Sequence, residues 1–155
     1  MSLPLPKFLT EAEKPWRAVA LGWPAATIPA LALSLLASLL FPSTAQPSFP
    51  MRGTTALMAL VVLAPFVETL IMAALLEVLR RFLNPWVAAL VSGIGWGIAH
   101  SLQAAAWGIP IWWVFFIFSR LYLTWRERSI LLAIAIPFAV HALNNLLPAL
   151  QVAYG

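Results

Sequence analysis

Residues 137–150 read PFAVHALNNLLPAL, an apolar stretch that contains one histidine and two adjacent asparagines. Apart from these three residues, the stretch has the composition of a helix that crosses a lipid bilayer. Imidazole and carboxamide groups cost free energy in hydrocarbon unless they have a partner or a function. The stretch therefore predicts a membrane helix with three polar residues that need an explanation.

The composition of the whole chain supports the same class of protein. Of the 155 residues, 63% are hydrophobic and 9% are charged, and the mean hydropathy is +0.92. In a soluble domain about a quarter of the residues are charged. We therefore expect a single all-α domain over residues 1–155, a polytopic integral membrane helical bundle of about five transmembrane helices. Apolar runs predict these helices at 17–41, 54–79, 85–107, 109–125 and 129–150, and residues 1–16 predict a segment at the membrane surface.

The basic residues predict the orientation of the bundle. Most of them precede the first predicted helix, follow the second or separate the last two, which places them on one face of the membrane. By the positive-inside rule, the N-terminus is then cytoplasmic and the C-terminus outside. We expect the protein in the plasma membrane of a prokaryote. Because the basic residues form no continuous face, the expected partner is the lipid bilayer and not a nucleic acid.

The residue types exclude several kinds of catalytic site. The chain has no cysteine and no aspartate. It therefore has no thiol nucleophile, no aspartyl dyad and no Ser-His-Asp triad, and no HExxH motif indicates a metalloprotease. Glutamate and histidine are ordinary zinc ligands, but here they do not occur as paired ligands on one helix. We therefore rank a zinc site below a site without a metal, and expect no cofactor.

Three ionisable side chains on different predicted helices fall at a similar depth in the membrane. With a rise of about 1.5 Å per residue, Glu68, His100 and His141 lie roughly 18 to 22 Å from the cytoplasmic ends of their helices. Asn145 is one helical turn beyond His141 and shares its face, whereas Asn144 is turned about 100° away. The pattern predicts one site formed by the first four residues, with Asn144 as an interhelical packing residue.

A second polar group lies near the predicted cytoplasmic surface. Glu77, Arg81 and Arg120 fall at similar shallow depths, and we interpret them as a structural ion-pair cluster. Glu68 is different, because the nearest basic residue on its own helix is about 20 Å away, too far for either side chain to reach. Glu68 is therefore predicted to have a function and Glu77 a structural role.

The predicted site contains the groups needed to hydrolyse a peptide bond without a covalent intermediate. A carboxylate can accept a proton from water, and an adjacent imidazole can orient that water. A second imidazole and a carboxamide N–H can donate to the oxyanion that forms when a carbonyl becomes tetrahedral. These roles suit the four predicted site residues.

At this point the sequence resembles the CAAX-processing and bacteriocin-processing family of intramembrane proteases, also called the abortive-infection family, which is of the glutamic type. The family motifs are Glu-Glu-x-x-x-Arg, Phe-x-x-x-His and His-x-x-x-Asn/Asp. Their counterparts are ETLIMA at 68–73, WGIAH at 96–100 and HALNN at 141–145, and the resemblance covers residues 65–147. It implies that Glu68 and His100 activate the water, and that His141 and Asn145 form the oxyanion hole. It also implies a membrane-anchored or lipidated peptide substrate.

The first motif departs from the family pattern at two positions. Thr69 stands in place of the second glutamate, and Ala73 in place of the arginine. The double change is either a compensated exchange that preserves net charge or the erosion of a protein that no longer cleaves. Two other classes of function therefore stay open. One is a non-catalytic membrane partner, such as an immunity or assembly protein, and the other is a small proton-coupled transporter.

Overall fold

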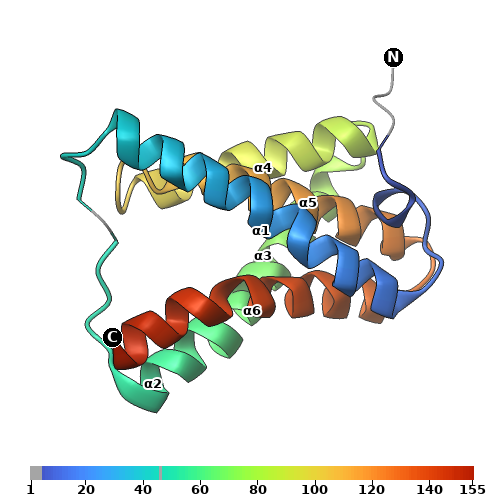
Figure 1. Cartoon of the computed structure of the whole chain (residues 1–155). Coiled ribbons are helices and arrows are strands. Elements are labelled where there is room, and N and C mark those ends of the chain that lie inside the picture. Colours follow the sequence, from blue (N-terminus) through green and yellow to red (C-terminus); the bar gives the residue numbers. More distant parts are fainter. Residues whose placement is uncertain (1–4, 46) are drawn as a thin grey trace.

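The structure is a computed structural model that describes residues 5–45 and 47–155 (Figure 1). The described residues form helices and no strand, which confirms the predicted all-α class. Residues 1–4 of the predicted surface segment lie outside the described residues. The elements are η1 (Lys7–Leu9), α1 (Pro15–Leu40), α2 (Gly53–Met58), η2 (Ala59–Leu63), α3 (Ala64–Leu79), α4 (Pro85–Ser101), α5 (Gly108–Arg126) and α6 (Ile130–Tyr154).

Four continuous helical segments are long and apolar enough to cross a membrane. They are α1, the continuous run α2–η2–α3, α5 and α6. The fifth predicted crossing corresponds to α4, whose 17 residues span about 26 Å, slightly less than the hydrocarbon core of a bilayer. Helix α4 ends at Ser101 and not at residue 107, because residues 102–107 turn back toward α5 although they are mostly apolar. Helix α6 continues to Tyr154, beyond the predicted end at residue 150.

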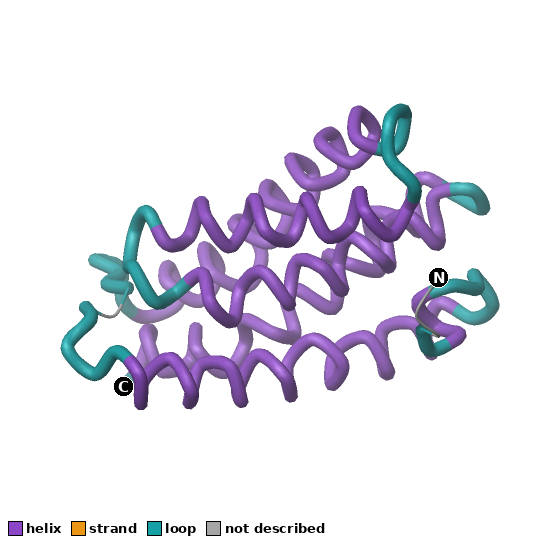
Figure 2. The backbone as a smooth tube through the Cα atoms, turned by 90° about the horizontal axis from the view of Figure 1, so that it is seen from above, coloured by secondary structure: helices purple, strands orange, loops and turns teal. Residues whose placement is uncertain are grey.

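Side-chain caps fix two of the turns at one end of the bundle. The Asn84 side chain accepts hydrogen bonds from the backbone N–H groups of Trp86 and Val87, at 3.1 and 3.0 Å, and so begins α4. Ser129 accepts one from Leu132 at 3.4 Å and begins α6 in the same way. The loops gather at the two ends of the bundle (Figure 2). The N-terminal segment shares one end with both capped turns, so the three basic regions of the sequence lie together (Figure 1).

Helix α5 forms the centre of the bundle. It packs against α1, α4 and α6, and Phe115, Phe118, Tyr122 and Trp125 on it are almost completely buried. Helices α1, α4 and α5 lie together on one side, and α6 lies with α2 on the other (Figure 1). By contrast, the large apolar side chains of α1 are mostly exposed, as expected for a face in contact with lipid.

Close packing of α4 on α5 depends on glycine. A Cβ atom on Gly93 would lie 2.6 Å from the carbonyl oxygen of Trp112, and one on Gly97 would lie 2.8 Å from the Trp112 Cβ. Both distances are shorter than atoms tolerate, so larger side chains would push the helices apart. Gly95 faces open space. The α4–α5 contact thereby fixes the position of the end of α4, where His100 lies.

Candidate active site

Glu68 and His141 lie side by side between α3 and α6. The Nε2 atom of His141 is 3.6 Å from the Oε2 atom of Glu68. The His141 side chain is 4% exposed and that of Glu68 is 27% exposed. The carboxylate is therefore accessible from outside the bundle, while the imidazole next to it is enclosed.

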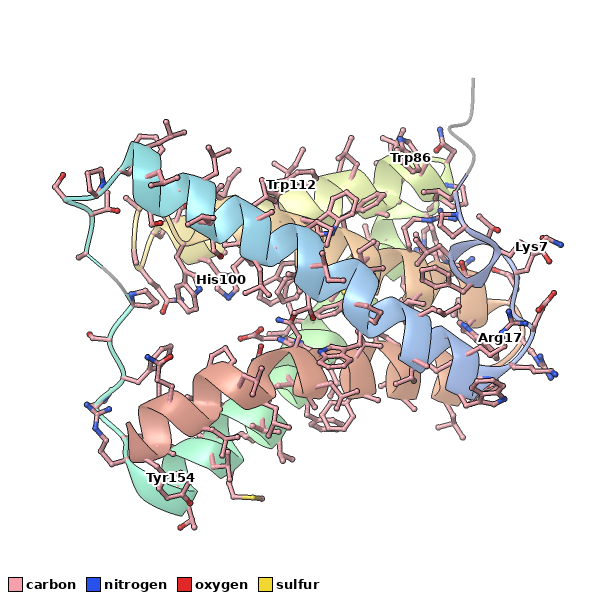
Figure 3. All side chains as sticks on the ribbon, in the orientation of Figure 1. Lys7, Arg17, Trp86, His100, Trp112 and Tyr154 are labelled. Carbon is pink, nitrogen blue, oxygen red and sulfur yellow. The ribbon has the colours of Figure 1, made fainter. Side chains whose placement is uncertain are left out.

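The second imidazole, that of His100, comes from α4. Its ring lies on the inner side of the helix, toward the space between the two layers (Figure 3). Its Nδ1 atom is 2.9 Å from the carbonyl oxygen of Trp96, one turn earlier. A proton on Nδ1 makes this contact a hydrogen bond and leaves Nε2 as an acceptor. The contact therefore fixes both the orientation of the ring and the nitrogen that is free for chemistry.

Aromatic rings link the two histidines. The ring of Phe115 lies 5.8 Å from that of His100 and 5.3 Å from that of His141, measured between ring centres. Trp107 packs edge-on against His100 at 4.6 Å, and Phe118 lies 4.7 Å from His141. These aromatic contacts could not be predicted from the sequence, apart from that of Trp96, one turn before His100. The rings place both imidazoles in apolar surroundings.

His141 has one nitrogen without a partner. Its Nδ1 atom is buried and makes no hydrogen bond with any residue that the structure describes. Leaving a buried polar atom unpaired costs free energy, and such atoms are concentrated at functional sites. His141 therefore has a hydrogen-bonding position available for a ligand in addition to its contact with Glu68.

Asn145 makes a contact that the sequence did not predict. Its Nδ2 atom donates a hydrogen bond of 3.1 Å to the carbonyl oxygen of Leu60 in the π-helical segment η2. In the π-helical register, the partner of this carbonyl would be the N–H of Pro65, which proline lacks. Asn145 replaces the missing donor and ties α6 to the segment before Glu68. One of its two amide hydrogens is thus engaged away from the predicted oxyanion site.

Asn144 is turned away from this contact. Its Oδ1 atom accepts a hydrogen bond of 3.0 Å from the hydroxyl of Thr27 on α1. The bond joins α6 to α1, which agrees with the expected role in helix packing.

The two positions that depart from the family motif are buried. Thr69 is 1% exposed and Ala73 is 6% exposed. The Thr69 hydroxyl makes no hydrogen bond within the described residues. Arg120 does not supply the missing guanidinium, because its Nη2 atom donates to the carbonyl oxygen of Leu9 at 3.0 Å, near the N-terminal end of the bundle. The charged pair of the family motif is thus replaced by two small, enclosed side chains.

The predicted ion-pair cluster exists around Glu77, but with other partners. The Glu77 carboxylate accepts from Arg126 Nε at 2.7 Å, from the Tyr122 hydroxyl at 2.8 Å and from Arg80 Nε at 3.0 Å. The prediction of Arg81 and Arg120 as its partners was wrong. Arg80 is three residues from Glu77 and caps the C-terminal end of α3, whereas Arg81 lies beyond the helix, in the turn that follows.

The residues that the structure describes contain no group of three histidine, cysteine, aspartate or glutamate side chains arranged to hold a metal ion.

Helices that span a membrane around one carboxylate and two imidazoles define an integral membrane protein with a polar site inside its bundle. The chain belongs to the Rce1-like family: residues 49–147 match the family model described as type II CAAX prenyl endopeptidase Rce1-like. This confirms the resemblance seen in the motifs, and membership of the family implies a protease of the CAAX type. The matched region contains all four predicted catalytic residues. No curated protein and no solved structure matches the chain.

Proposed function

We propose that the protein is a glutamic-type intramembrane endopeptidase that hydrolyses a peptide bond next to a membrane-embedded or lipidated segment. The observation that supports this most is the contact of 3.6 Å between the partly exposed Glu68 and the enclosed His141. Among the described residues of the region 49–147, which matches a protease family, this is the only contact within 4.0 Å between a carboxylate and an imidazole. Both side chains retain capacity for further hydrogen bonds.

In the proposed reaction, Glu68 accepts a proton from a water molecule that His100 orients through Nε2. The water oxygen forms a bond to the carbonyl carbon of the substrate, and the carbonyl oxygen becomes an oxyanion. His141 donates a hydrogen bond to this oxyanion, together with the remaining amide hydrogen of Asn145. The C–N bond then breaks, and the proton held by Glu68 passes to the leaving nitrogen. The immediate products are a carboxylic acid and an amine, and Glu68 is ionised again.

The substrate that we propose is a peptide with a prenylated cysteine in a CAAX-type C-terminal sequence, which is the class that the family description names. An accessible Glu68 within a membrane helix suits a cleavage site that a lipid anchor holds at the bilayer. We also propose that the N-terminus is cytoplasmic and the C-terminus outside, because the basic regions share one end of the bundle. Labelling of single cysteines from either side of a prokaryotic plasma membrane tests this orientation.

A reporter peptide with a farnesylated C-terminal CAAX sequence, mixed with purified protein in lipid vesicles, tests the proposal. Glu68→Gln, His100→Ala and His141→Ala are each expected to slow cleavage by about 100-fold or more, while each variant is still recovered folded. Retained cleavage in all three variants would exclude this mechanism. Loss of folded protein in all three would instead assign the polar site a structural role.

A non-catalytic membrane partner is the second candidate, favoured by one observation. Thr69 and Ala73 replace an acid and a base of the family motif, and both are buried as small side chains. For this function, Glu68 and His141 only join α3 to α6. The wild-type protein would then cleave no reporter, and Glu68→Gln would lower its melting temperature.

A further inference from the structure

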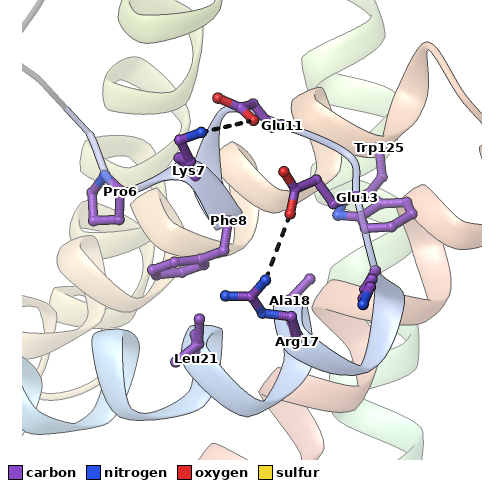
Figure 4. Close-up of a pocket in the computed structure, with 10 residues that line it drawn as sticks. Pro6, Lys7, Phe8, Glu11, Glu13, Arg17, Ala18, Leu21 and Trp125 are labelled. Atoms are coloured by element: carbon purple, nitrogen blue, oxygen red, sulfur yellow. Dashed lines mark ion pairs between the residues drawn. The ribbon is translucent and has the colours of Figure 1, made fainter.

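A cavity of about 470 Å³ lies between the N-terminal segment and the first turns of α1 (Figure 4). Apart from Trp125 on α5, its lining comes from residues that precede the family-matched region. It lies at the end of the bundle that carries the basic turns, far along the chain from the candidate active site. The cavity therefore needs an explanation of its own.

The wall formed by the N-terminal segment is held in place by several hydrogen bonds. The carbonyl oxygen of Leu9 accepts from Arg120 Nη2 at 3.0 Å and from the hydroxyl of Thr124 at 2.7 Å. Arg128 Nη1 donates to the carbonyl oxygens of Ala12 and Glu13, at 2.6 and 2.9 Å. These bonds fasten the segment to the bundle on both sides of the cavity. The cavity is therefore preformed, which favours binding of a ligand.

Two of the three cationic side chains that line the cavity are paired with carboxylates, and one is not. Lys7 and Glu11 form an ion pair at 3.8 Å, and Arg17 and Glu13 form another at 3.7 Å (Figure 4). Lys14, which also lines the cavity, has no carboxylate partner among the described residues. It directly precedes α1, and the start of a helix carries a partial positive charge. The cavity thus offers one net positive charge to an anion.

Trp125 supplies an unused hydrogen-bond donor. Its side chain is completely buried, and its Nε1 atom has no hydrogen-bond partner in the part of the chain that the structure describes. The indole nitrogen is turned toward the cavity (Figure 4). A buried N–H without an acceptor costs free energy, and an anionic oxygen in the cavity would satisfy it. This donor and the cation of Lys14 both favour a ligand that carries oxygen and negative charge.

One side of the cavity is apolar. Phe8 and Leu21 line it, and Leu21 is 42% exposed on the outer surface of α1. Trp16, which is 67% exposed, marks this level as the interface between lipid and water. A ligand that contacts both Lys14 and the apolar side at Leu21 needs a polar head and a hydrocarbon chain.

We propose that the cavity binds the head group of an anionic phospholipid, with its phosphodiester near Lys14 and Trp125 and an acyl chain along Leu21. A head group with one negative charge, such as that of phosphatidylglycerol, matches the single unpaired cation. Phosphatidylcholine brings an additional positive charge and matches it less well. This site is independent of the peptidase function proposed above.

Native mass spectrometry of the purified full chain, titrated with phosphatidylglycerol, tests this site. Wild-type protein is expected to retain one tightly bound lipid. Lys14→Gln and Trp125→Phe are each expected to weaken its binding about tenfold, because each removes one hydrogen bond to a charged oxygen. Arg52→Gln at the opposite end and Trp16→Phe at the lipid interface are the matched controls, and both should bind lipid like the wild type.

Two further titrations distinguish the ligand. Phosphatidylcholine is expected to bind more weakly than phosphatidylglycerol, and inorganic phosphate is expected not to be retained. Equal binding of the two lipids, retention of phosphate alone, or unchanged phosphatidylglycerol binding in Lys14→Gln would each overturn the proposal. Lys14 is exposed, so its variant tests the site even if Trp125→Phe lowers the folded yield.

Discussion

Glu68 and Glu77 lie on the same helix, α3, and their side chains are similarly exposed, at 27% and 30%. Their surroundings differ. The Glu77 carboxylate accepts three hydrogen bonds of 3.0 Å or less, two of them from arginine. Among the described residues, Glu68 has only His141 as a partner, at 3.6 Å. A carboxylate has about four positions for hydrogen-bond donors, so Glu77 is nearly saturated and Glu68 is not. Free hydrogen-bonding capacity separates the proposed catalytic carboxylate from the one that forms ion pairs.

The largest effect is expected from Glu68→Gln. The carboxamide keeps the shape of the side chain but cannot take a proton from water, so cleavage of a prenylated reporter should fall by about 100- to 10,000-fold. The rate in lipid vesicles measures this, and a thermal melt checks the fold. A variant that is folded and fully active would show that the free capacity of Glu68 has no catalytic use.

The next largest effect is expected from His100→Ala, which removes the proposed acceptor for the attacking water. Cleavage should fall by about 100-fold, while the melting temperature changes little. Ser101→Ala, at the last residue of the same helix, is the control and should cleave normally. If both variants cleave equally well, His100 only fills space beside Trp107 and Phe115.

Substitution of two glycines in α4 tests whether cleavage depends on the position of this helix. Gly97→Ala introduces a Cβ 2.8 Å from that of Trp112, so α4 must move away from α5 and take His100 with it. We expect about tenfold slower cleavage, because small displacements of catalytic groups are costly. Gly95→Ala, whose Cβ meets nothing within 4 Å, is the matched control. Equal rates in the two variants would contradict the importance of this contact.

We expect alanine substitutions of the two adjacent asparagines to differ in their effect on the cleavage rate. Asn145→Ala leaves the Leu60 carbonyl without a donor just before Glu68, and we expect cleavage to slow several-fold together with a lower melting temperature. Asn144→Ala loses only its bond to Thr27 and should leave the cleavage rate unchanged. Parallel assays of both variants measure this, and a reversed order would mean that Leu60 is not the important partner.

The smallest effect on catalysis is expected from Glu77→Gln. This change weakens the bonds to Arg126 and Arg80 but leaves the site untouched, so the melting temperature should fall by a few degrees. The cleavage rate at a permissive temperature should equal that of the wild type. A marked loss of activity in folded Glu77→Gln would remove the distinction between the two carboxylates.

The sequence predicted the helical bundle because hydropathy reports directly on transfer into lipid. It predicted the proximity of Glu68 and His141 because both positions lie at one depth, and helical rise converts position into depth. It did not predict the turn at residues 102–107, since these residues are mostly apolar and the turn depends on the close contact of α4 with α5.

The contacts of Asn145 and Glu77 could not be predicted from the sequence, because they depend on local helix geometry. The Leu60 carbonyl needs Asn145 only because η2 is π-helical, and hydropathy does not distinguish a π-helix from an α-helix. Glu77 was predicted to form ion pairs and does so, but its pairing with Arg80 rather than Arg81 depends on where α3 ends, which depth alone does not specify.

The most direct test is to measure cleavage of one farnesylated CAAX reporter by Glu68→Gln and Glu77→Gln, prepared and reconstituted in parallel. Both substitutions remove one carboxylate from the same helix and preserve its shape. We expect that Glu68→Gln stays folded and loses cleavage, whereas Glu77→Gln melts a few degrees lower and cleaves like the wild type. Equal cleavage by both variants, or loss of cleavage only in Glu77→Gln, would contradict it.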